Sequence, residues 1–125
     1  MSDWICTDPD TYQYCKMVSD HSWEFYELRH TLRQTNKGVV EDPIVCYAII
    51  DLHDYSLDEI WEICSGYYDS FEDIVATYGF RNAFQIMAEC IFEQTENYAL
   101  SVYRFVTEEQ AVQMIQSRVI NKVKL

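Results

Sequence analysis

The sequence predicts a mainly α-helical domain of five to six helices, with at most one small two-stranded β element. Apolar residues recur at helical spacing over residues 14–32. Capping boxes, in which the first and fourth residues cap a helix, begin at Ser56 and Thr107. At 125 residues the chain is expected to form one globular domain, residues 1–125. An α+β fold is the alternative.

The first part of the chain predicts one long amphipathic helix. Thr7-Asp8-Pro9-Asp10 combines a polar cap, a proline in the first turn and acid near the positive end of the helix dipole. We expect this helix to end at Asn36-Lys37-Gly38, and a break near Ser19-Asp20 is an alternative. Spacings of four and three connect Tyr14, Val18, Phe25, Leu28 and Leu32, with His21 on the same stripe.

The segment Val39–Leu52 fits two conformations. Asp42-Pro43 is typical of a helix start, which favours a short buried helix, and helix is the preferred assignment. The apolar run that follows, Ile44–Leu52, is equally suited to a strand, and periodicity does not separate the two. The strand alternative would pair this run with Tyr98–Val106, which alternates loosely.

The second half of the chain gives clearer helix signals. Its capping residues stand directly before apolar stretches, and Gly66 and Gly79 stand where helices are expected to end. The predicted helices are Leu57–Ser65, a short helix from Ser70 to Tyr78-Gly79, Asn82–Thr95, and a final helix that begins at Thr107.

Acidic residues strongly outnumber basic ones, 21 to nine, for a formal net charge of −12. Ten of the acids lie between Gly38 and Phe80, a stretch that contains no Lys or Arg. Contacts to nucleic-acid phosphates are made by Lys and Arg, so we expect no direct binding to nucleic acid or to an anionic membrane. The charge favours a basic protein surface as the partner.

The cysteines and the N-terminus indicate a cytoplasmic protein. The five cysteines are irregularly spaced and form no Cys-x-x-Cys pair, which excludes a typical zinc ribbon and predicts free thiols. The first residues lack the basic and apolar regions of a signal peptide. No apolar run approaches the roughly 20 residues of a membrane helix.

The nearest approach to a catalytic or metal site is Asp51-Leu52-His53-Asp54. Two carboxylates and an imidazole are suitable metal ligands, but no second His-bearing motif completes the set. The chain has no Gly-rich phosphate loop, GxSxG or HExxH pattern. We therefore predict no enzyme, metal or cofactor, and keep a metal-dependent hydrolase at Asp51, His53 and Asp54 as a minor alternative.

The predicted function is that of a non-enzymatic acidic protein that occupies a basic, nucleic-acid-binding surface of a partner. Carboxylates at i and i+3 or i+4 on a helix stand about 5–6 Å apart. This spacing is comparable to that of backbone phosphates, about 3.4 Å of axis per step. An alternative is a structural or regulatory interaction module that uses exposed tyrosines. The predicted partner-binding residues are Asp54, Asp58, Glu59, Glu62, Tyr67, Tyr68, Asp69, Glu72 and Asp73.

In general character the chain resembles the small, acidic proteins of bacteriophages and mobile elements, without a motif that identifies a family. Some proteins of that kind inhibit host defence nucleases by occupying nucleic-acid grooves, as anti-CRISPR proteins do. The resemblance implies an anti-defence inhibitor that acts as a nucleic-acid mimic.

Overall fold

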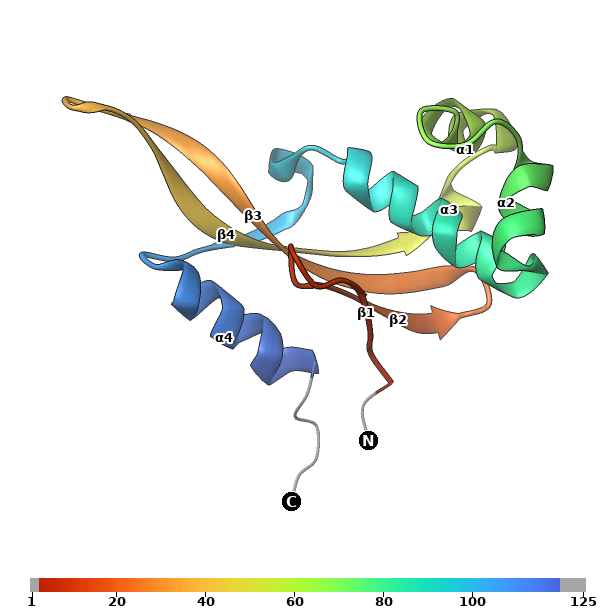
Figure 1. Ribbon diagram of the computed structural model, residues 1–125, viewed down its shortest axis with the longest axis horizontal. Helices are drawn as coiled ribbons and strands as arrows, with labels where there is room; N and C mark the ends of the chain where they lie inside the picture. Colours follow the sequence, from red (N-terminus) through yellow and green to blue (C-terminus); the bar gives the residue numbers. More distant parts are fainter. Residues whose placement is uncertain (1–2, 120–125) are drawn as a thin grey trace, which may run out of the picture. The chain divides into compact units, whose positions relative to one another are not determined.

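Four β-strands lie between Ile5 and Asp51, which makes the prediction of a mainly α fold wrong. The computed structural model describes residues 3–119, and these combine a five-stranded antiparallel sheet with four α-helices (Figure 1). The strands follow one another in the sheet in the order β1-β2-β3-β4-β5. The elements are β1 (Ile5–Asp8), β2 (Gln13–Ser19), β3 (Ser22–Thr35), β4 (Gly38–Asp51), the 3-10 helix η1 (Leu52–Asp54), α1 (Leu57–Cys64), α2 (Phe71–Tyr78), α3 (Phe80–Gln94), the 3-10 helix η2 (Asn97–Ala99), β5 (Ser101–Arg104) and α4 (Glu108–Val119).

The segment predicted as one long helix forms the end of β1, all of β2 and all of β3. Two features expected of that helix are turns between strands: the break near Ser19-Asp20 and the end at Asn36-Lys37-Gly38. At the β2–β3 turn, the hydroxyls of Ser19 and Ser22 are hydrogen-bonded at 2.7 Å. At the β3–β4 turn, the Thr35 hydroxyl donates to the Gly38 carbonyl at 2.7 Å, and Gly38 has a φ of +117° that suits glycine. Asn36-Lys37-Gly38 therefore reverses the chain within a hairpin.

The apolar run that was assigned to a buried helix is strand β4, so the preferred assignment for Val39–Leu52 is also wrong. The strand alternative is present: Ile44 of β4 lies opposite Arg104 of β5, and Tyr47 lies opposite Ser101. This pairing belongs to a larger sheet than the expected two-stranded element.

The four helices predicted in the second half are present, and local hydrogen bonds specify the starts of three of them. The helix expected at Asn82–Thr95 is α3, which begins two residues earlier, at Phe80, without a side-chain cap. Ser56 Oγ accepts from the Glu59 amide at 3.1 Å, and Glu59 Oε1 accepts from the Ser56 amide at 2.8 Å. Ser70 Oγ accepts from the Asp73 amide at 3.0 Å. At the start of α4, Thr107 Oγ1 accepts from the Gln110 amide.

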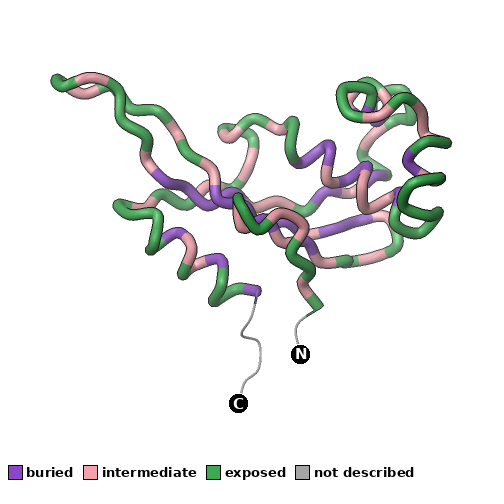
Figure 2. The backbone as a smooth tube through the Cα atoms, in the orientation of Figure 1, coloured by how far each residue is buried: buried purple, intermediate pink, exposed green. Residues whose placement is uncertain are grey.

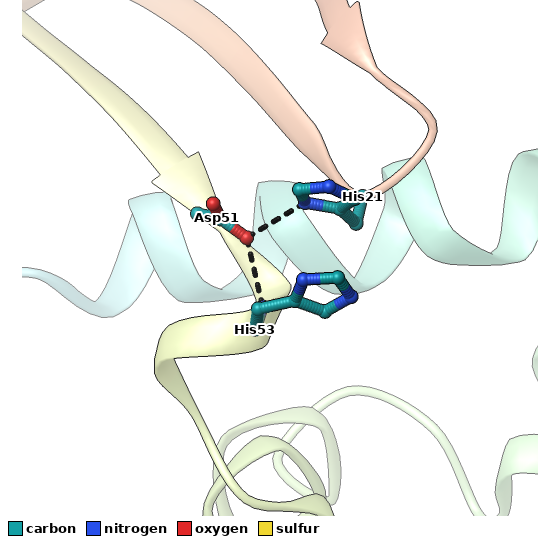
Figure 3. A group of neighbouring side chains, drawn as sticks. All are labelled: His21, Asp51 and His53. Atoms are coloured by element: carbon teal, nitrogen blue, oxygen red, sulfur yellow. Dashed lines mark hydrogen bonds and ion pairs between the residues drawn. The ribbon is translucent and has the colours of Figure 1, made fainter.

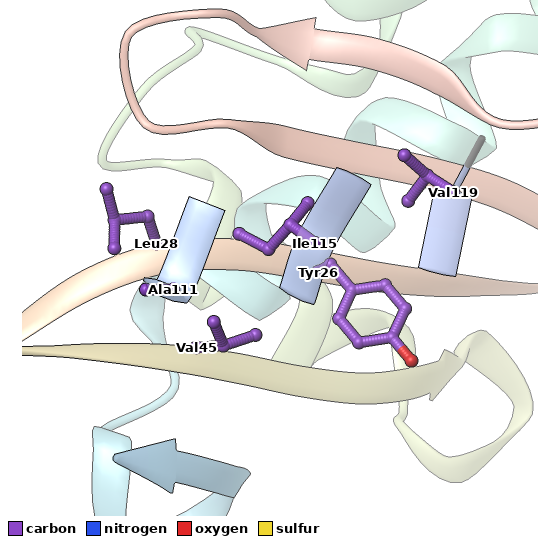
Figure 4. Close-up of a cluster of buried hydrophobic side chains, with 6 residues drawn as sticks. All are labelled: Tyr26, Leu28, Val45, Ala111, Ile115 and Val119. Carbon is purple, nitrogen blue, oxygen red and sulfur yellow. The ribbon is translucent and has the colours of Figure 1, made fainter. Parts of the chain in front are cut away.

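The chain divides into two compact units. Unit 1 contains Met1–Lys16, Phe25–Ala48 and Asn97–Leu125, and unit 2 contains Met17–Glu24 and Ile49–Glu96. In unit 1, α4 packs against β3 and β4 (Figure 4). In unit 2, α1 and α2 both pack against α3. The core around α4 consists of Tyr26, Leu28, Val45, Ala111, Ile115 and Val119.

All five cysteines are free thiols in the structure, as predicted, and only Cys6 is exposed. Cys64 of α1 and Cys90 of α3 interact within unit 2, and this interaction together with burial raises the pKa of the Cys90 thiol. Among the described residues, no helix has both the length and the apolar composition needed to cross a membrane.

Candidate functional site

Seven of the predicted binding residues are exposed acids on η1, α1, α2 and the loop between the two α-helices. Every one of these side chains is exposed to solvent, and exposed positions make up half of α1 and more than half of α2 (Figure 2). The acidic face is defined as Asp54, Asp58, Glu59, Glu62, Asp69, Glu72 and Asp73.

The apolar positions of the two helices determine which side chains face solvent. Ile60 and Cys64 of α1 and Ile74 of α2 are buried. The exposed carboxylates of these two helices therefore point away from the core. The acids of the first turns lie near the positive ends of the helix dipoles, where negatively charged side chains stabilise a helix.

The negative charge of the acidic face is not balanced by neighbouring cations. None of its seven carboxylates forms an ion pair with a Lys or Arg among residues 3–119; the Lys and Arg ion pairs found there join Arg29 to Glu27 and Arg33 to Asp42 in unit 1. Unit 2 contains thirteen acidic residues and a single basic one, Arg81. A positively charged partner would therefore meet an uncompensated field.

The two predicted tyrosines differ in how far they are available to a partner. Tyr67 is 50% exposed, and its hydroxyl accepts a hydrogen bond from Gln94 Nε2 at 2.8 Å. Tyr68 is only partly exposed, and its hydroxyl lies 3.0 Å from the Tyr78 hydroxyl. Burial, with this hydrogen bond, raises the pKa of Tyr68. Tyr67 is thus the better candidate for a contact residue.

Two hollows accompany the acidic face within unit 2. One, of about 450 Å³, is lined by polar and apolar residues that include Glu59, Glu62 and Gln94. The other, of about 520 Å³, is almost wholly apolar, and we call it the apolar groove. It lies among α1, α2 and α3 and is lined mainly by Leu57, Ile60, Phe71, Val75, Phe80 and Phe84.

A second cluster brings together His21, Asp51 and His53 (Figure 3). His21 Nδ1 lies 2.9 Å from Asp51 Oδ1, and the His53 amide donates to the same oxygen at 2.9 Å. Both hydrogen bonds lower the pKa of Asp51, and the one from the His53 amide has the larger effect. The Leu52 amide donates to the His21 carbonyl at 2.8 Å, which joins the β2–β3 turn to the end of β4.

The cluster only partly matches the predicted hydrolase site. Asp51 and His53 are present, His21 takes the third place, and Asp54 is not a member. The ligand atoms lie within 4.8 Å of one another, and two imidazoles with a carboxylate are a suitable donor set for zinc. However, the two imidazole rings are stacked, with centroids 3.7 Å apart and planes inclined by 17°.

This stacking disfavours shared coordination of an ion. A metal binds an imidazole nitrogen in the plane of the ring, and nearly parallel planes do not meet at an ion bound to both. Coordination of one ion by both imidazoles would require one of the rings to rotate. The adjoining hollow, about 270 Å³, is lined by Asp20, His21, Leu52, His53 and Phe84, and so offers no nucleophilic hydroxyl or thiol. As arranged, the cluster is a hydrogen-bonded connection between two turns.

Sequence reasoning located the carboxylates but missed His21 and the apolar groove. His21 stands thirty positions before Asp51, and no local pattern indicates that the β2–β3 turn approaches the end of β4. The groove depends on how three helices pack, and helical periodicity alone shows only that each has an apolar side. Comparisons with protein families, curated proteins and solved structures found no match to this chain.

Proposed function

We propose that this is a non-enzymatic binding protein whose acidic face occupies a basic, nucleic-acid-binding surface of a partner protein. The observation that carries the proposal is the concentration of charge in unit 2, where α1 and α2 present carboxylates to solvent without a pairing Lys or Arg among the described residues. Such a surface gains Coulomb energy and a faster association rate when a partner supplies the missing cations.

The spacing of the carboxylates supports a resemblance to a nucleic-acid backbone. On α1, Asp58 and Glu62 are four positions apart, and Glu59 and Glu62 are three positions apart. Side chains at these separations on one helix stand about 5–6 Å apart. Together with the resemblance to phage and mobile-element proteins, this favours an inhibitor of a host defence nuclease.

We further propose that the protein acts in the cytoplasm and that catalysis plays no part in its activity. Five free thiols, four of them buried, suit a reducing compartment. The His21–Asp51–His53 cluster has stacked rings, and the adjoining hollow is lined by no hydroxyl or thiol nucleophile.

A second candidate function is an interaction module anchored by tyrosine. It is favoured by the exposure of Tyr67 beside the acidic face, since a half-exposed tyrosine buries a large area in an interface with little loss of conformational entropy. The two candidates differ in their expected salt dependence, because screening weakens charge contacts and leaves aromatic contacts nearly unchanged.

The test is a pull-down of the partner followed by affinity measurements at low and high salt. The variant to use is Asp58→Lys/Glu62→Lys/Glu72→Lys, which leaves the capping residue Glu59 in place. Its matched control, Asp10→Lys/Glu41→Lys/Glu109→Lys, makes the same change in net charge at three exposed positions of unit 1.

We expect the unit 2 variant to lose more than about tenfold in affinity, which corresponds to about 1.4 kcal/mol, and the unit 1 control to lose much less. Tyr67→Ala should matter more than either if the tyrosine candidate is correct. Wild-type affinity of the unit 2 variant at both salt concentrations would rule out the acidic-face proposal.

A further inference from the structure

The apolar groove leaves large hydrophobic side chains exposed beside the acidic face. Leu57 at the start of α1 is 71% exposed, and Phe80 at the start of α3 is 69% exposed. Both line the groove, whose deeper wall includes the buried residues Ile60, Ala83 and Met87. Apolar residues gathered at an open groove indicate a binding site more strongly than single exposed ones do, because covering them removes a continuous apolar area from water.

Charged residues accompany the lining residues along the chain. Asp54 follows the lining residue His53, Asp58 follows Leu57, and Glu72 follows Phe71. Arg81, the only basic residue of unit 2, follows Phe80. No carboxylate is itself among the lining residues; we call the exposed residues Asp54, Asp58 and Glu72, which adjoin lining residues in the sequence, the acidic rim. The complement of the groove and this rim is a segment with large apolar side chains on one side and mainly Lys or Arg beside them.

We propose that the apolar groove binds an amphipathic basic helix of the partner, which inserts apolar side chains at i and i+3 or i+4 and places Lys and Arg along the acidic rim. This inference rests on the proposed function and names what the partner presents to unit 2. Binding of an amphipathic helix in a hydrophobic groove is a common mode of peptide recognition. A volume of about 520 Å³ lies within the range of well-formed ligand sites.

Electrostatics favours this occupant over two others. A second copy of the chain would bring another unit 2, with thirteen acidic residues against one basic, to the same rim. An anionic lipid surface would likewise meet carboxylates of its own sign. A basic helix removes the apolar residues from water and neutralises the rim at the same time.

The probe for the test is a fluorescently labelled peptide of leucine and lysine, about five helical turns long, patterned with leucine on one helix face. Two control peptides accompany it: one of the same composition, scrambled so that no helix face is apolar, and an oligolysine of equal charge. Fluorescence anisotropy gives the three affinities. We expect the patterned peptide to bind about tenfold more tightly than either control, because only it fills the groove.

Matched variants then assign the binding to the groove. Leu57→Ser/Phe80→Ser changes two exposed lining residues, and Leu32→Ser/Val106→Ser changes two exposed apolar residues of unit 1. We expect the first variant to bind the patterned peptide about tenfold more weakly and oligolysine as wild type does. The unit 1 variant should bind both peptides as wild type does. Far-UV circular dichroism and thermal unfolding check that both variants fold.

The outcomes separate this inference from the proposed function. In one outcome, Asp58→Lys/Glu62→Lys/Glu72→Lys abolishes binding of both the partner and the patterned peptide, and Leu57→Ser/Phe80→Ser weakens neither. The acidic-face function then stands, and the groove inference is overturned. If only the groove variant weakens binding, the acidic-face function and the proposed contacts of Lys and Arg with the acidic rim are overturned, and the groove stands as a site for an apolar helix face alone. A concentration-dependent dimer that Leu57→Ser/Phe80→Ser dissociates would show that a second copy covers the groove, which also overturns the inference.

Discussion

The two units of this protein use charge in opposite ways. The sequence ranges of unit 1 contain eight acidic and eight basic residues, and those of unit 2 contain thirteen acidic and one basic, so the whole formal charge of −12 belongs to unit 2. In unit 1, Arg29 Nε donates to the buried carboxylate of Glu27 at 2.6 Å, and Gln13 Nε2 donates to it at 3.0 Å. The charges of unit 1 thus contribute to its own structure, and those of the acidic face form no ion pair with a Lys or Arg among the described residues.

The largest expected effect is on the buried ion pair of unit 1. Glu27 is 4% exposed, and Glu27→Ala would leave the Arg29 guanidinium without its buried carboxylate. Breaking such a pair from one side costs about 3 kcal/mol of unfolding free energy. Urea unfolding measures it, with the exposed Glu41→Ala as the control, for which about 0.5 kcal/mol or less is expected. Equal costs for both variants would show that buried charge does not stabilise unit 1.

The helix caps of unit 2 are expected to contribute less. Ser56→Ala and Ser70→Ala each remove the side-chain acceptor of a helix N-terminus, at a cost of about 1 kcal/mol. Ser65→Ala is the matched control, because its hydroxyl donates to a carbonyl within the last turn of α1 and caps no helix start. If Ser65→Ala destabilises the protein as much as the cap variants do, local capping does not explain the stability of α1 and α2.

Salt should affect the two units differently. Raising NaCl from about 0.01 M to 0.1 M shortens the Debye length from about 30 Å to about 10 Å, which weakens repulsion within the acidic face. Hydrogen exchange of the α1 and α2 amides should therefore become slower, and exchange of the α4 amides in unit 1 should change little. If exchange of the α4 amides slows as much as exchange of the α1 and α2 amides, the uneven distribution of charge has no effect on local stability.

A smaller effect concerns two carboxyl groups whose pKa values are lowered by different neighbours. The Arg33 guanidinium lowers the pKa of Asp42 in unit 1, and the His53 amide and His21 ring lower that of Asp51 in unit 2. Because each folded-state pKa is below the ordinary value of about 3.9, each ionised group stabilises the fold above that value. This stabilisation is lost as the pH falls through the folded-state pKa.

Carboxyl titration by NMR checks both groups. We expect His21→Ala to raise the pKa of Asp51 toward its ordinary value and to leave that of Asp42 unchanged, because His21 is hydrogen-bonded only to the first of these carboxylates. An unchanged pKa of Asp51 in this variant would contradict the hydrogen-bonded geometry of the cluster.

The smallest expected effect is that of metal ions. The stacked rings of His21 and His53 are poorly arranged to share one ion, so zinc and a chelator should each leave the melting temperature unchanged. Thermal unfolding with and without zinc is the measurement. A rise in melting temperature with zinc that His53→Ala removes would instead support the hydrolase alternative.

The sequence by itself determined the features that depend on neighbouring residues. The side chains of Ser56, Ser70 and Thr107 cap the backbone within three positions, so α1, α2 and α4 begin where the capping patterns predict. The concentration of acid between residues 38 and 80 is likewise visible without a structure.

Only the tertiary structure decided the strands, the apolar groove and the histidine cluster. In β3, Trp23 and Phe25 are buried toward one face of the sheet, and Tyr26 and Leu28 are buried toward the other, where they meet α4. Burial on both faces removes the alternation that marks a strand, so the remaining apolar positions also fit a helical period. The strands form because hydrogen bonds between distant segments, such as β4 with β5, complete the sheet. The same long-range packing brings His21 to Asp51 and places α1, α2 and α3 around the groove.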